Sequence, residues 1–261
     1  IRGLALMVEV LHNSRPFDAL FRHANSYGVK IFEFIMRAYN SIDRAPGRVK
    51  EVFSGFMDET RNELWESADE LMEHYREEEN YRRLYNGEVG GNVIYKYKAM
   101  SLAHAVNDWI DFLGEICNDV IREKCAQDSK ACEAGLEEVE WIKEFSKHRL
   151  AGVLDAQGDI KPRNMNASSD FLGWLASPYG TPIRNFKFAE PVRFNFEFSP
   201  DQLQVRADHF KRYGTNVNAL SKIVTRVGSV ESLFRKVEAT GGRKLQVEQS
   251  QDDLVRYSLS N

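Results

Sequence analysis

The stretch Asp58–Lys124 constrains the fold more than any other part of the chain, because it predicts two long amphipathic helices. The first is expected over Asp58–Glu79, and the apolar residues that share one of its faces are Leu64, Trp65, Ala68, Leu71, Met72 and Tyr75. The second is expected from about Asn92 to the end of the stretch, with a near-heptad apolar stripe over Leu102–Ile121. At a rise of about 1.5 Å per residue, this second helix would be roughly 50 Å long.

Glycines separate the two predicted helices. Asn86-Gly87 and Gly90-Gly91 favour a chain reversal, because glycine reaches positive φ angles without a steric cost. We therefore predict an antiparallel helical hairpin in which Trp109 is buried against the Leu64–Tyr75 face. Gly90, Gly91 and Asn92 also open the second helix, where free backbone N–H groups could attract an anion. A plain turn capped by Asn92 is the alternative.

The rest of the first 150 residues predicts further helices of the same bundle. Apolar spacing indicates helices over Leu4–His12, Val29–Ile42 and Leu136–Leu150, with a polar loop over Ala126–Gly135. A strand over Lys30–Met36 remains an alternative, since periodicity cannot decide so short an apolar run. We expect residues 1–150 to form a helical bundle around the hairpin.

Residues 151–198 predict a connector that carries a small β element. Ala151–Thr181 is rich in Gly, Asn, Ser and Asp, so we expect a domain boundary or a segment that covers a site. In Phe186–Phe198 the apolar period changes to 2, which predicts a half-buried strand or a small hairpin around Glu190-Pro191. An aromatic stripe of this kind can stack nucleic-acid bases, but without dense flanking Lys and Arg it favours core packing.

The C-terminal section predicts three short helices. Ser199-Pro200-Asp201-Gln202 is typical of a capped helix N-terminus, and glycines separate two further helical patterns that end by Gly242. We expect residues 199–242 to be a three-helix unit and residues 243–261 to be a polar tail. The predicted fold class is mainly α: a helical bundle with a small β element and a C-terminal three-helix unit.

Composition excludes several classes of protein. The net charge of −4 argues against nucleic-acid or anionic-membrane binding by the whole surface. No apolar run approaches the roughly 20 residues that a membrane-spanning helix needs. The three cysteines, Cys117, Cys125 and Cys132, fit a reducing compartment better than a disulfide scaffold, so we expect a cytoplasmic protein. The apolar opening without an initiator Met leads us to expect a piece of a longer polypeptide, with a trimmed N-terminus as the alternative.

The segment Asp58–Arg83 is strongly acidic. It holds ten Asp and Glu residues against four Arg, a balance of −6. A solvated helix face is the ordinary cause of such a run, and a docking surface for a basic partner is the alternative.

No stretch of the sequence carries a recognisable catalytic motif. His104 and Asp108, at i and i+4 on the predicted long helix, could hold a metal or serve as a base, although a hydrated helix face is the simpler interpretation. The cysteine spacing matches neither a zinc nor an iron–sulfur pattern, so we expect no metal site.

Nucleic-acid binding has one candidate location, the predicted three-helix unit. Its possible basic face consists of Lys222, Arg226, Arg235 and Lys236. A helix-turn-helix would need a short turn before a recognition helix, and Tyr213-Gly214-Thr215 could supply it.

Several short strings, taken in order, resemble a known family. They are Glu59-Thr60-Arg61, Leu64-Trp65, Leu84 to Asn92 with its glycines, Phe198-Ser199-Pro200-Asp201-Gln202, Phe210-Lys211-Arg212-Tyr213-Gly214 and Leu233-Phe234-Arg235. In this order they are similar to the helical region that follows the catalytic barrel in cobalamin-binding radical S-adenosylmethionine proteins. The family's CxxxCxxC motif and its cobalamin-binding half are absent from this chain.

The resemblance implies that this chain is the C-terminal accessory portion of such an enzyme, for example a methyltransferase. The parent enzyme would hold a [4Fe–4S] cluster, S-adenosylmethionine and cobalamin, and this portion alone would bind none of them. It would cap the barrel and shape the channel for a small-molecule or peptide substrate, with the N-terminal catalytic portion as its partner. No catalytic residue of the family can be carried onto a position here. The alternatives are a free-standing helical binding or adaptor module and a DNA-binding regulator.

Overall fold

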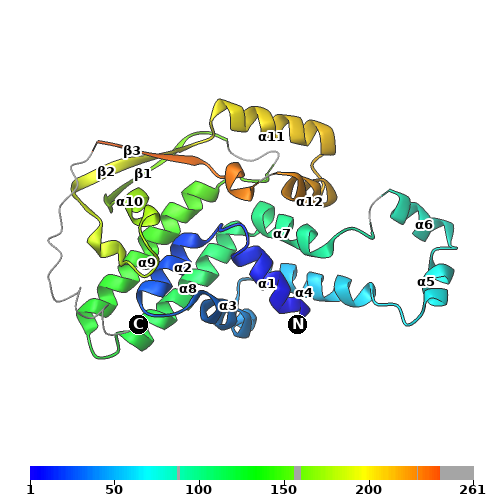
Figure 1. The fold of residues 1–261 in the computed structure, drawn as a ribbon, viewed down its shortest axis with the longest axis horizontal. Coiled ribbons are helices and arrows are strands. Elements are labelled where there is room, and N and C mark those ends of the chain that lie inside the picture. The colour runs from blue at the N-terminus through cyan, green and yellow to red at the C-terminus, as the bar shows by residue number, and fades with distance from the viewer. Residues whose placement is uncertain (87–88, 156–159, 228, 242–261) are drawn as a thin grey trace.

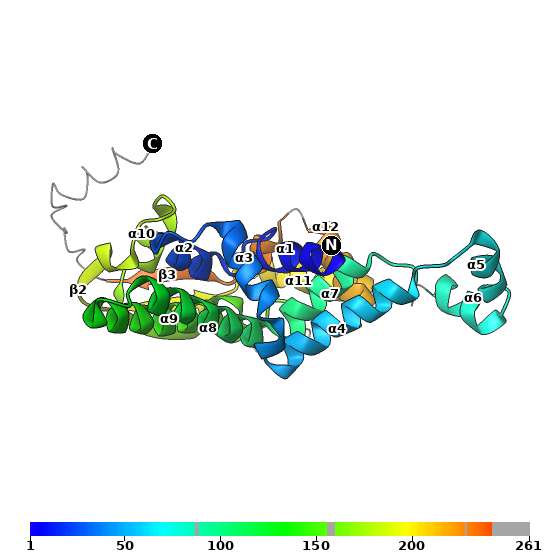
Figure 2. The same ribbon diagram turned by 90° about the horizontal axis from the view of Figure 1, so that it is seen from below.

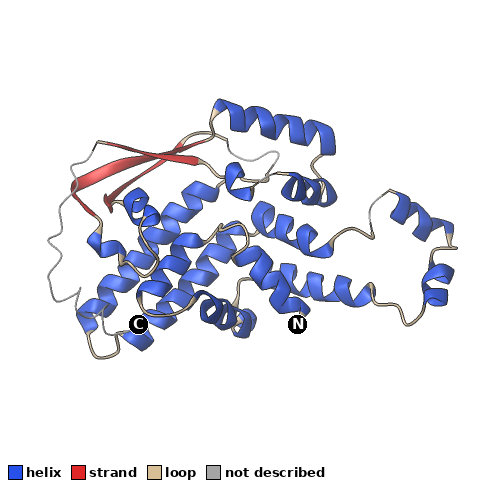
Figure 3. Ribbon diagram, viewed as in Figure 1, coloured by secondary structure: helices blue, strands red, loops and turns tan. Residues whose placement is uncertain are grey.

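The computed structural model describes residues 1–86, 89–155, 160–227 and 229–241. In these residues the chain forms twelve α-helices and one three-stranded antiparallel sheet, which confirms the predicted mainly α class. Helices fill the body of the molecule and the sheet lies at one edge of it (Figures 1 and 3).

The first four helices build one side of the body. They are α1 (Arg2–Leu11), α2 (Asp18–Ser26), α3 (Ile31–Asn40) and α4 (Gly47–Asn62), with a 3-10 turn η1 (Ile42–Arg44) before α4. Gly28 has a φ of +83°, which ends α2 in the left-handed conformation that glycine adopts most easily. The run Lys30–Met36 is helical, so the strand alternative is wrong.

Three central helices carry the main core. They are α7 (Val93–His104), α8 (Val106–Lys124) and α9 (Ser129–Leu150), and α8 and α9 pack along each other (Figure 2). α9 begins seven residues before Leu136, where the sequence predicts its start, because the Asp128 side chain accepts a hydrogen bond from the Ala131 amide at 3.0 Å. The predicted polar loop over Ala126–Gly135 is therefore largely wrong.

The predicted helix over Asp58–Glu79 is wrong. α4 ends at Asn62, and the chain continues as two short helices, α5 (Ala68–His74) and α6 (Glu78–Tyr85). We call residues 63–86 the arm, because they project from the body in both views (Figures 1 and 2). The Ser67 hydroxyl accepts a hydrogen bond from the Glu70 amide and so caps the start of α5. The backbone of Ser67 is extended, whereas one continuous helix would require a helical conformation there.

The second half of the predicted hairpin also differs from a single long helix. Ala105, at φ −128° and ψ 11°, interrupts it and separates α7 from α8. Trp109 is fully buried, as predicted, but α8 packs mainly against α9, α2 and α3, and no helix of the arm is among its main packing partners in the described structure. α4 packs against α7, together with α12 and α1. A hairpin therefore exists, with α4 in place of the predicted helix.

The sheet consists of β1 (Arg163–Ser169), β2 (Lys187–Glu197) and β3 (Lys236–Thr240), in the order β1-β2-β3. Phe194 lies opposite Met165 on one side, and Phe196 lies opposite Val237 on the other. The predicted alternation holds: every second side chain from Val192 to Phe198 is buried. The chain runs through Pro191 as one strand, since the ladder with β1 is irregular there and needs no N–H from proline.

The buried face of the sheet packs on α9 through aromatic rings. The Phe145 ring stacks on Phe171 with centroids 4.4 Å apart, and it meets the edge of Phe196 at 5.3 Å. Phe171 belongs to α10 (Phe171–Ala176), inside the segment Ala151–Thr181 that the sequence predicts to be a connector. The described part of Ala151–Thr181 contains β1, α10 and the fully buried Trp174, so it holds more regular structure than its Gly- and Asn-rich composition indicates.

The C-terminal section begins as predicted and then departs from the prediction. α11 (Pro200–Tyr213) has the expected capping box between Ser199 and Gln202, and α12 (Val217–Arg226) follows. The third predicted helix is wrong: the chain forms a 3-10 turn, η3 (Val230–Leu233), and then pairs with β2 as strand β3. A further short turn, η2 (Ile183–Asn185), precedes β2. The predicted polar tail, 243–261, lies outside the described residues.

Trp109 provides the first test of this core. The change Trp109→Ala should lower the free energy of unfolding by about 3–5 kcal/mol, because it removes a fully buried aromatic side chain. Urea unfolding measures the difference. Trp141→Ala, in an exposed position on α9, is the matched control and should change stability far less. Equal, small effects of the two changes would contradict the packing described here.

His23 provides a second test, through pH. Its ring is fully buried, with Nε2 3.3 Å from the Gly135 carbonyl oxygen, and burial lowers its pKa to about 4. The unfolded state, with a pKa near 6.5, therefore binds more protons than the folded state between pH 6.5 and pH 4. His23 should make no pH-dependent contribution above about pH 6.5, and should cost about 3 kcal/mol of stability as the pH falls to 4.

The control for this pH dependence is the exposed His104. Denaturant unfolding at a series of pH values should show a flatter profile for His23→Gln than for the parent chain. His104→Gln should keep the parent's profile. A His23→Gln profile as steep as the parent's would contradict the buried, neutral imidazole.

Candidate functional site at the base of the arm

A cavity of about 730 Å³ lies where the arm joins the body. Its walls come from the end of α4, from both helices of the arm and from the residues that lead into α7. The size is within the range of small-molecule pockets in proteins. It brings together segments that the sequence separates by more than twenty residues, such as Glu59 and Gly90.

One wall is a charged cluster built on α4 and α7. The Glu59 carboxylate accepts hydrogen bonds from the Lys96 ammonium at 2.6 Å and from the Tyr97 hydroxyl at 3.0 Å. Burial, together with the hydrogen bond to Glu59, raises the pKa of Tyr97, so its hydroxyl stays a proton donor. Gly55 makes this geometry possible, because a Cβ at that position would lie 2.9 Å from the Tyr97 hydroxyl oxygen.

A second carboxyl group borders the same wall. The pKa of Glu63 is raised, first because its carboxyl loses contact with water and then because Glu59 carries a like charge. Two neighbouring carboxyl groups thus differ: Lys96 pairs with the Glu59 carboxylate, while Glu63 takes up a proton more readily than an ordinary glutamate. The oxygens of both carboxyl groups can accept hydrogen bonds from a polar molecule.

The opposite wall is aromatic. The Trp65 ring lies 4.7 Å from the His74 ring, and His74 meets the edge of Tyr75 at 5.0 Å. The Asn80 side-chain amide donates to the His74 carbonyl at 3.1 Å, which ties α6 to the end of α5. This cluster holds the two arm helices together and presents a flat apolar surface to the cavity.

The glycines singled out from the sequence lie at this cavity. Gly90 and Gly91 line it, and Asn92 caps α7 next to them by accepting a hydrogen bond from the Tyr95 amide at 3.4 Å. Gly90 has a φ of +77°, and a Cβ there would lie 2.7 Å from the Leu84 side chain, so only glycine fits. Gly87 and Glu88 lie outside the described residues.

The structure separates the other sequence-derived candidates. His104 is exposed at the end of α7 and Asp108 is half-buried in the first turn of α8, so the break at Ala105 puts them on different helices. Arg226 is exposed at the end of α12. Arg235 is only 2% exposed, and its guanidinium donates to the carbonyl oxygens of Ala151, Lys161 and Phe196. Arg235 therefore has a structural role. It cannot be part of the basic surface predicted from the sequence, because its side chain is buried.

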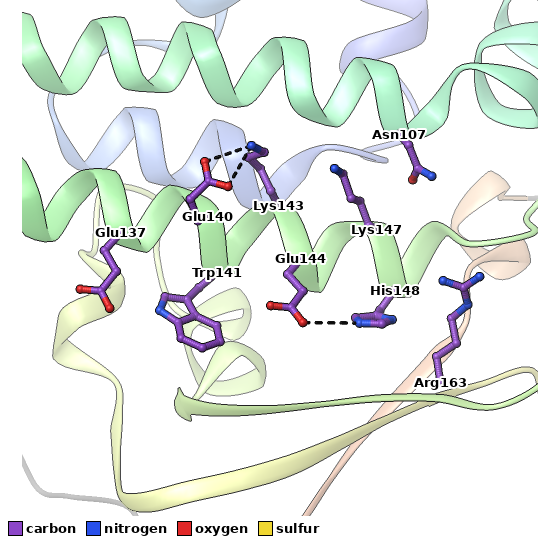
Figure 4. Close-up of a pocket in the computed structure, with 9 residues that line it drawn as sticks. All are labelled: Asn107, Glu137, Glu140, Trp141, Lys143, Glu144, Lys147, His148 and Arg163. Carbon is purple, nitrogen blue, oxygen red and sulfur yellow. Dashed lines mark hydrogen bonds and ion pairs between the residues drawn. The ribbon is translucent and has the colours of Figure 1, made fainter.

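A second groove of about 610 Å³ follows α9, and its charged groups largely neutralise one another. Figure 4 shows Lys143 and Lys147 on the side of α9 that faces α8, and Trp141 and His148 on the other side. Lys143 pairs with Glu140 at 3.0 Å, and Lys147 pairs with Asp111 of α8 at 2.7 Å.

His148 occupies the other side of this groove. It lies 3.7 Å from Glu144 and stacks on Phe196 at 5.3 Å. Partial burial lowers the pKa of its imidazole. A His beside a carboxylate can accept a proton, and Arg163 borders the same part of the groove, but no Ser, Thr or Cys is among the described residues that line it. We therefore rank the arm cavity above the α9 groove.

The sequence analysis did not identify the aromatic wall or the α9 groove. Trp65 and Tyr75 were assigned to the buried face of one long helix, and nothing in their spacing distinguishes a core face from a cavity wall. The pattern Glu137, Glu140, Glu144 with Lys143 and Lys147 is the ordinary pattern of a solvated helix face. Only the folded arrangement places these residues around cavities.

Two further findings concern metal binding and membrane-spanning helices in the described residues. No group of three or more His, Cys, Asp and Glu side chains in them is arranged to hold a metal ion. No helix among them combines the length and apolarity that crossing a bilayer requires.

In the comparisons with known proteins, no protein-family model, no curated protein and no solved structure matches this chain.

The ion pair in the arm cavity provides a test of its charged wall. In a double-mutant cycle, Glu59→Gln and Lys96→Met should show a coupling of up to about 1 kcal/mol, because both side chains are only about a quarter exposed. Urea unfolding of the two single variants and the double variant measures it. The exposed pair Asp58 and Arg61 is the control, with an expected coupling near zero. No coupling between Glu59 and Lys96 would mean that the charged wall is not formed in solution.

Proposed function

We propose that this chain is a helical accessory portion of a cobalamin-dependent radical S-adenosylmethionine enzyme. In this proposal the arm docks on the catalytic part, and the cavity at its base contributes to the substrate channel. The observation that carries the proposal is the unusual surface of the arm. The order of the sequence strings described above supports the choice of family.

The arm exposes far more apolar surface than its size accounts for. Half of the large apolar side chains that are exposed in the described residues belong to it, and these are Leu64, Met72, Tyr81, Leu84 and Tyr85. Leu64 and Met72 are each 63% exposed and Tyr85 is 80% exposed. Single exposed apolar residues are ordinary, but a concentration on one projecting element is typical of a surface that another protein covers.

The strings that resemble the family come together at two places in the fold. The strings around Glu59 and around Gly90 meet at the arm cavity. The strings at Phe198–Gln202 and at Leu233–Arg235 meet at a structural joint, where the Gln202 amide donates to the Phe234 carbonyl at 2.8 Å. The Arg235 guanidinium also stacks over the Phe198 ring at 4.6 Å. In this proposal the first meeting point has a binding role and the second a structural role.

The chain's own residues fit binding and positioning better than cofactor ligation. Cys117 is fully buried, donates to the Leu20 carbonyl at 3.5 Å and has a pKa raised by burial, so it does not fit a cluster ligand. We therefore assign the [4Fe–4S] cluster, S-adenosylmethionine and cobalamin to the catalytic part of the enzyme. In the arm cavity, Glu59, Lys96 and Trp65 would bind and orient a polar substrate while the arm excludes water.

An alternative assigns the arm to a free-standing adaptor with a basic partner. This alternative rests on the acidic segment 58–83, which has a net charge of −6 and whose charged side chains are mostly exposed. Docking through charge should weaken steeply as salt is raised, whereas docking through Leu64 and Tyr85 should depend on salt only weakly. No observation of the described structure favours the DNA-binding alternative.

The test is association with the catalytic part. The part that carries CxxxCxxC and the cobalamin domain should be sought directly upstream in the same gene, expressed separately and titrated with this chain. We expect binding that weakens at least about tenfold in a Leu64→Ser, Tyr85→Ser variant. A Val205→Ser, Ile160→Ser variant is the matched control, because these exposed apolar residues lie on the body.

Three outcomes would overturn the proposal. An upstream region without the cluster motif and the cobalamin domain would exclude membership of the family. Unchanged binding by the arm variant would show that the arm is not the docking surface. Binding that disappears at high salt and ignores the apolar changes would favour the adaptor with a basic partner.

A further inference from the structure

A third cleft, of about 570 Å³, lies on the body between α2, α9, α10 and β3. α2 and α10 lie close together in both views (Figures 1 and 2). Five cationic side chains and three acidic ones border the cleft, so its charge is positive although the whole chain is acidic. Four of the five cations are arginines, whose planar guanidinium groups suit phosphate and carboxylate oxygens.

The nearest acidic group is already engaged by the chain itself. The Asp18 carboxylate accepts a hydrogen bond from Arg22 Nε at 2.7 Å on one oxygen, and from the Tyr179 hydroxyl on the other. Arg22 also donates to the Ser177 carbonyl at 2.7 Å and stacks over the Tyr179 ring at 4.3 Å. Asp18 and Arg22 thus neutralise each other, and Asp18 repels an incoming anion only weakly.

Arg149 supplies a half-buried cation to the cleft. It lies 3.6 Å from Glu231, longer than a close ion pair, and its guanidinium lies 5.4 Å from the centre of the Phe234 ring. Its pKa is lowered by burial, which shows that its positive charge is poorly solvated. An anion in the cleft would relieve this cost.

Arg15 supplies an unpaired cation at the rim, in an unusual backbone conformation. It has a φ of +47°, and it is the only non-glycine residue with positive φ in the described part of the chain. Its guanidinium is exposed and has no hydrogen-bond or ion-pair partner among the described residues, and the same holds for the Lys236 ammonium. Strained residues of this kind are concentrated at binding sites, where the strain fixes the direction of a side chain.

Besides its charged groups, which include the exposed Glu238, the cleft has an apolar part. Leu172 and Leu175 of α10 and Val237 of β3 border it beside the cations. A ligand that uses the whole cleft therefore combines a charged end with an apolar body, and the volume is that of a small-molecule site.

We propose that this cleft binds a small organic anion, with a phosphate or carboxylate group at Arg15, Arg149 and Lys236 and its apolar part against Leu172 and Leu175. The inference is independent of the function proposed for the arm, whose residues lie elsewhere.

Isothermal titration calorimetry at low ionic strength tests the class of ligand. The probes are phenyl phosphate, benzoate, inorganic phosphate and benzyl alcohol. We expect phenyl phosphate or benzoate to bind at least about tenfold more tightly than inorganic phosphate, because only they bury apolar surface. Benzyl alcohol should not bind, and added salt should weaken the anions. The order of phenyl phosphate and benzoate identifies the preferred charged group. Absence of binding by both aromatic anions at millimolar concentration would overturn the proposal.

Substitutions at Arg15 separate a binding role from a structural one. Arg15→Gly should weaken binding about tenfold by removing a charged hydrogen-bond donor, while leaving Tm unchanged or raising it, since glycine tolerates positive φ. Lys236→Gln should also weaken binding. Arg226→Gln, an exposed arginine on α12, is the control and should bind like the parent. A lowered Tm with unchanged binding in Arg15→Gly, or equal binding by all variants, would contradict the anion site.

Discussion

The contact between Phe145 and the aromatic side chains of the sheet is the interaction on which the rest of the structure depends. Phe145 of α9 stacks on Phe171 and meets the edges of Phe194 and Phe196, so one side chain joins the helical body, α10 and β2. Aromatic rings bury a large area each, and they pack with defined mutual angles. The sheet therefore has one position on α9, and this position sets walls of both the α9 groove and the cleft between α2, α9, α10 and β3.

Buried Arg235 completes the joint between these layers. Its backbone amide donates to the Arg149 carbonyl at 3.1 Å, and its guanidinium satisfies carbonyl oxygens at Ala151, Lys161 and Phe196. A guanidinium with several donors in one plane can satisfy several otherwise unpaired carbonyl groups where strands and loops converge. Arg235 and Arg15 are the same type of residue at the same cleft. The first is bonded to the fold, and the second is available to a ligand.

The arm shows the opposite balance. The Ser67 cap starts its first helix, a small aromatic cluster packs beside that helix, and most of its apolar side chains stay in water. An element with so few tertiary contacts is among the least stable parts of a fold, and binding elements are commonly of this kind. Leu64 and Met72 are exposed, although the hairpin prediction buried them against Trp109. The same exposure supports a docking surface on the arm.

The sequence by itself determined the elements whose pattern is local. The capping box at Ser199, the alternation in β2, the burial of Trp109 and the mainly helical class follow from neighbours a few residues apart, and each is present in the structure. Only the tertiary structure decided what each apolar face packs against, because periodicity identifies a face without identifying its partner. Residues 230–240 look helical alone, yet pairing with β2 satisfies their backbone and makes part of them a strand. The cavities also arise from residues far apart in the chain, such as Arg15 and Lys236, and no local pattern can bring these together.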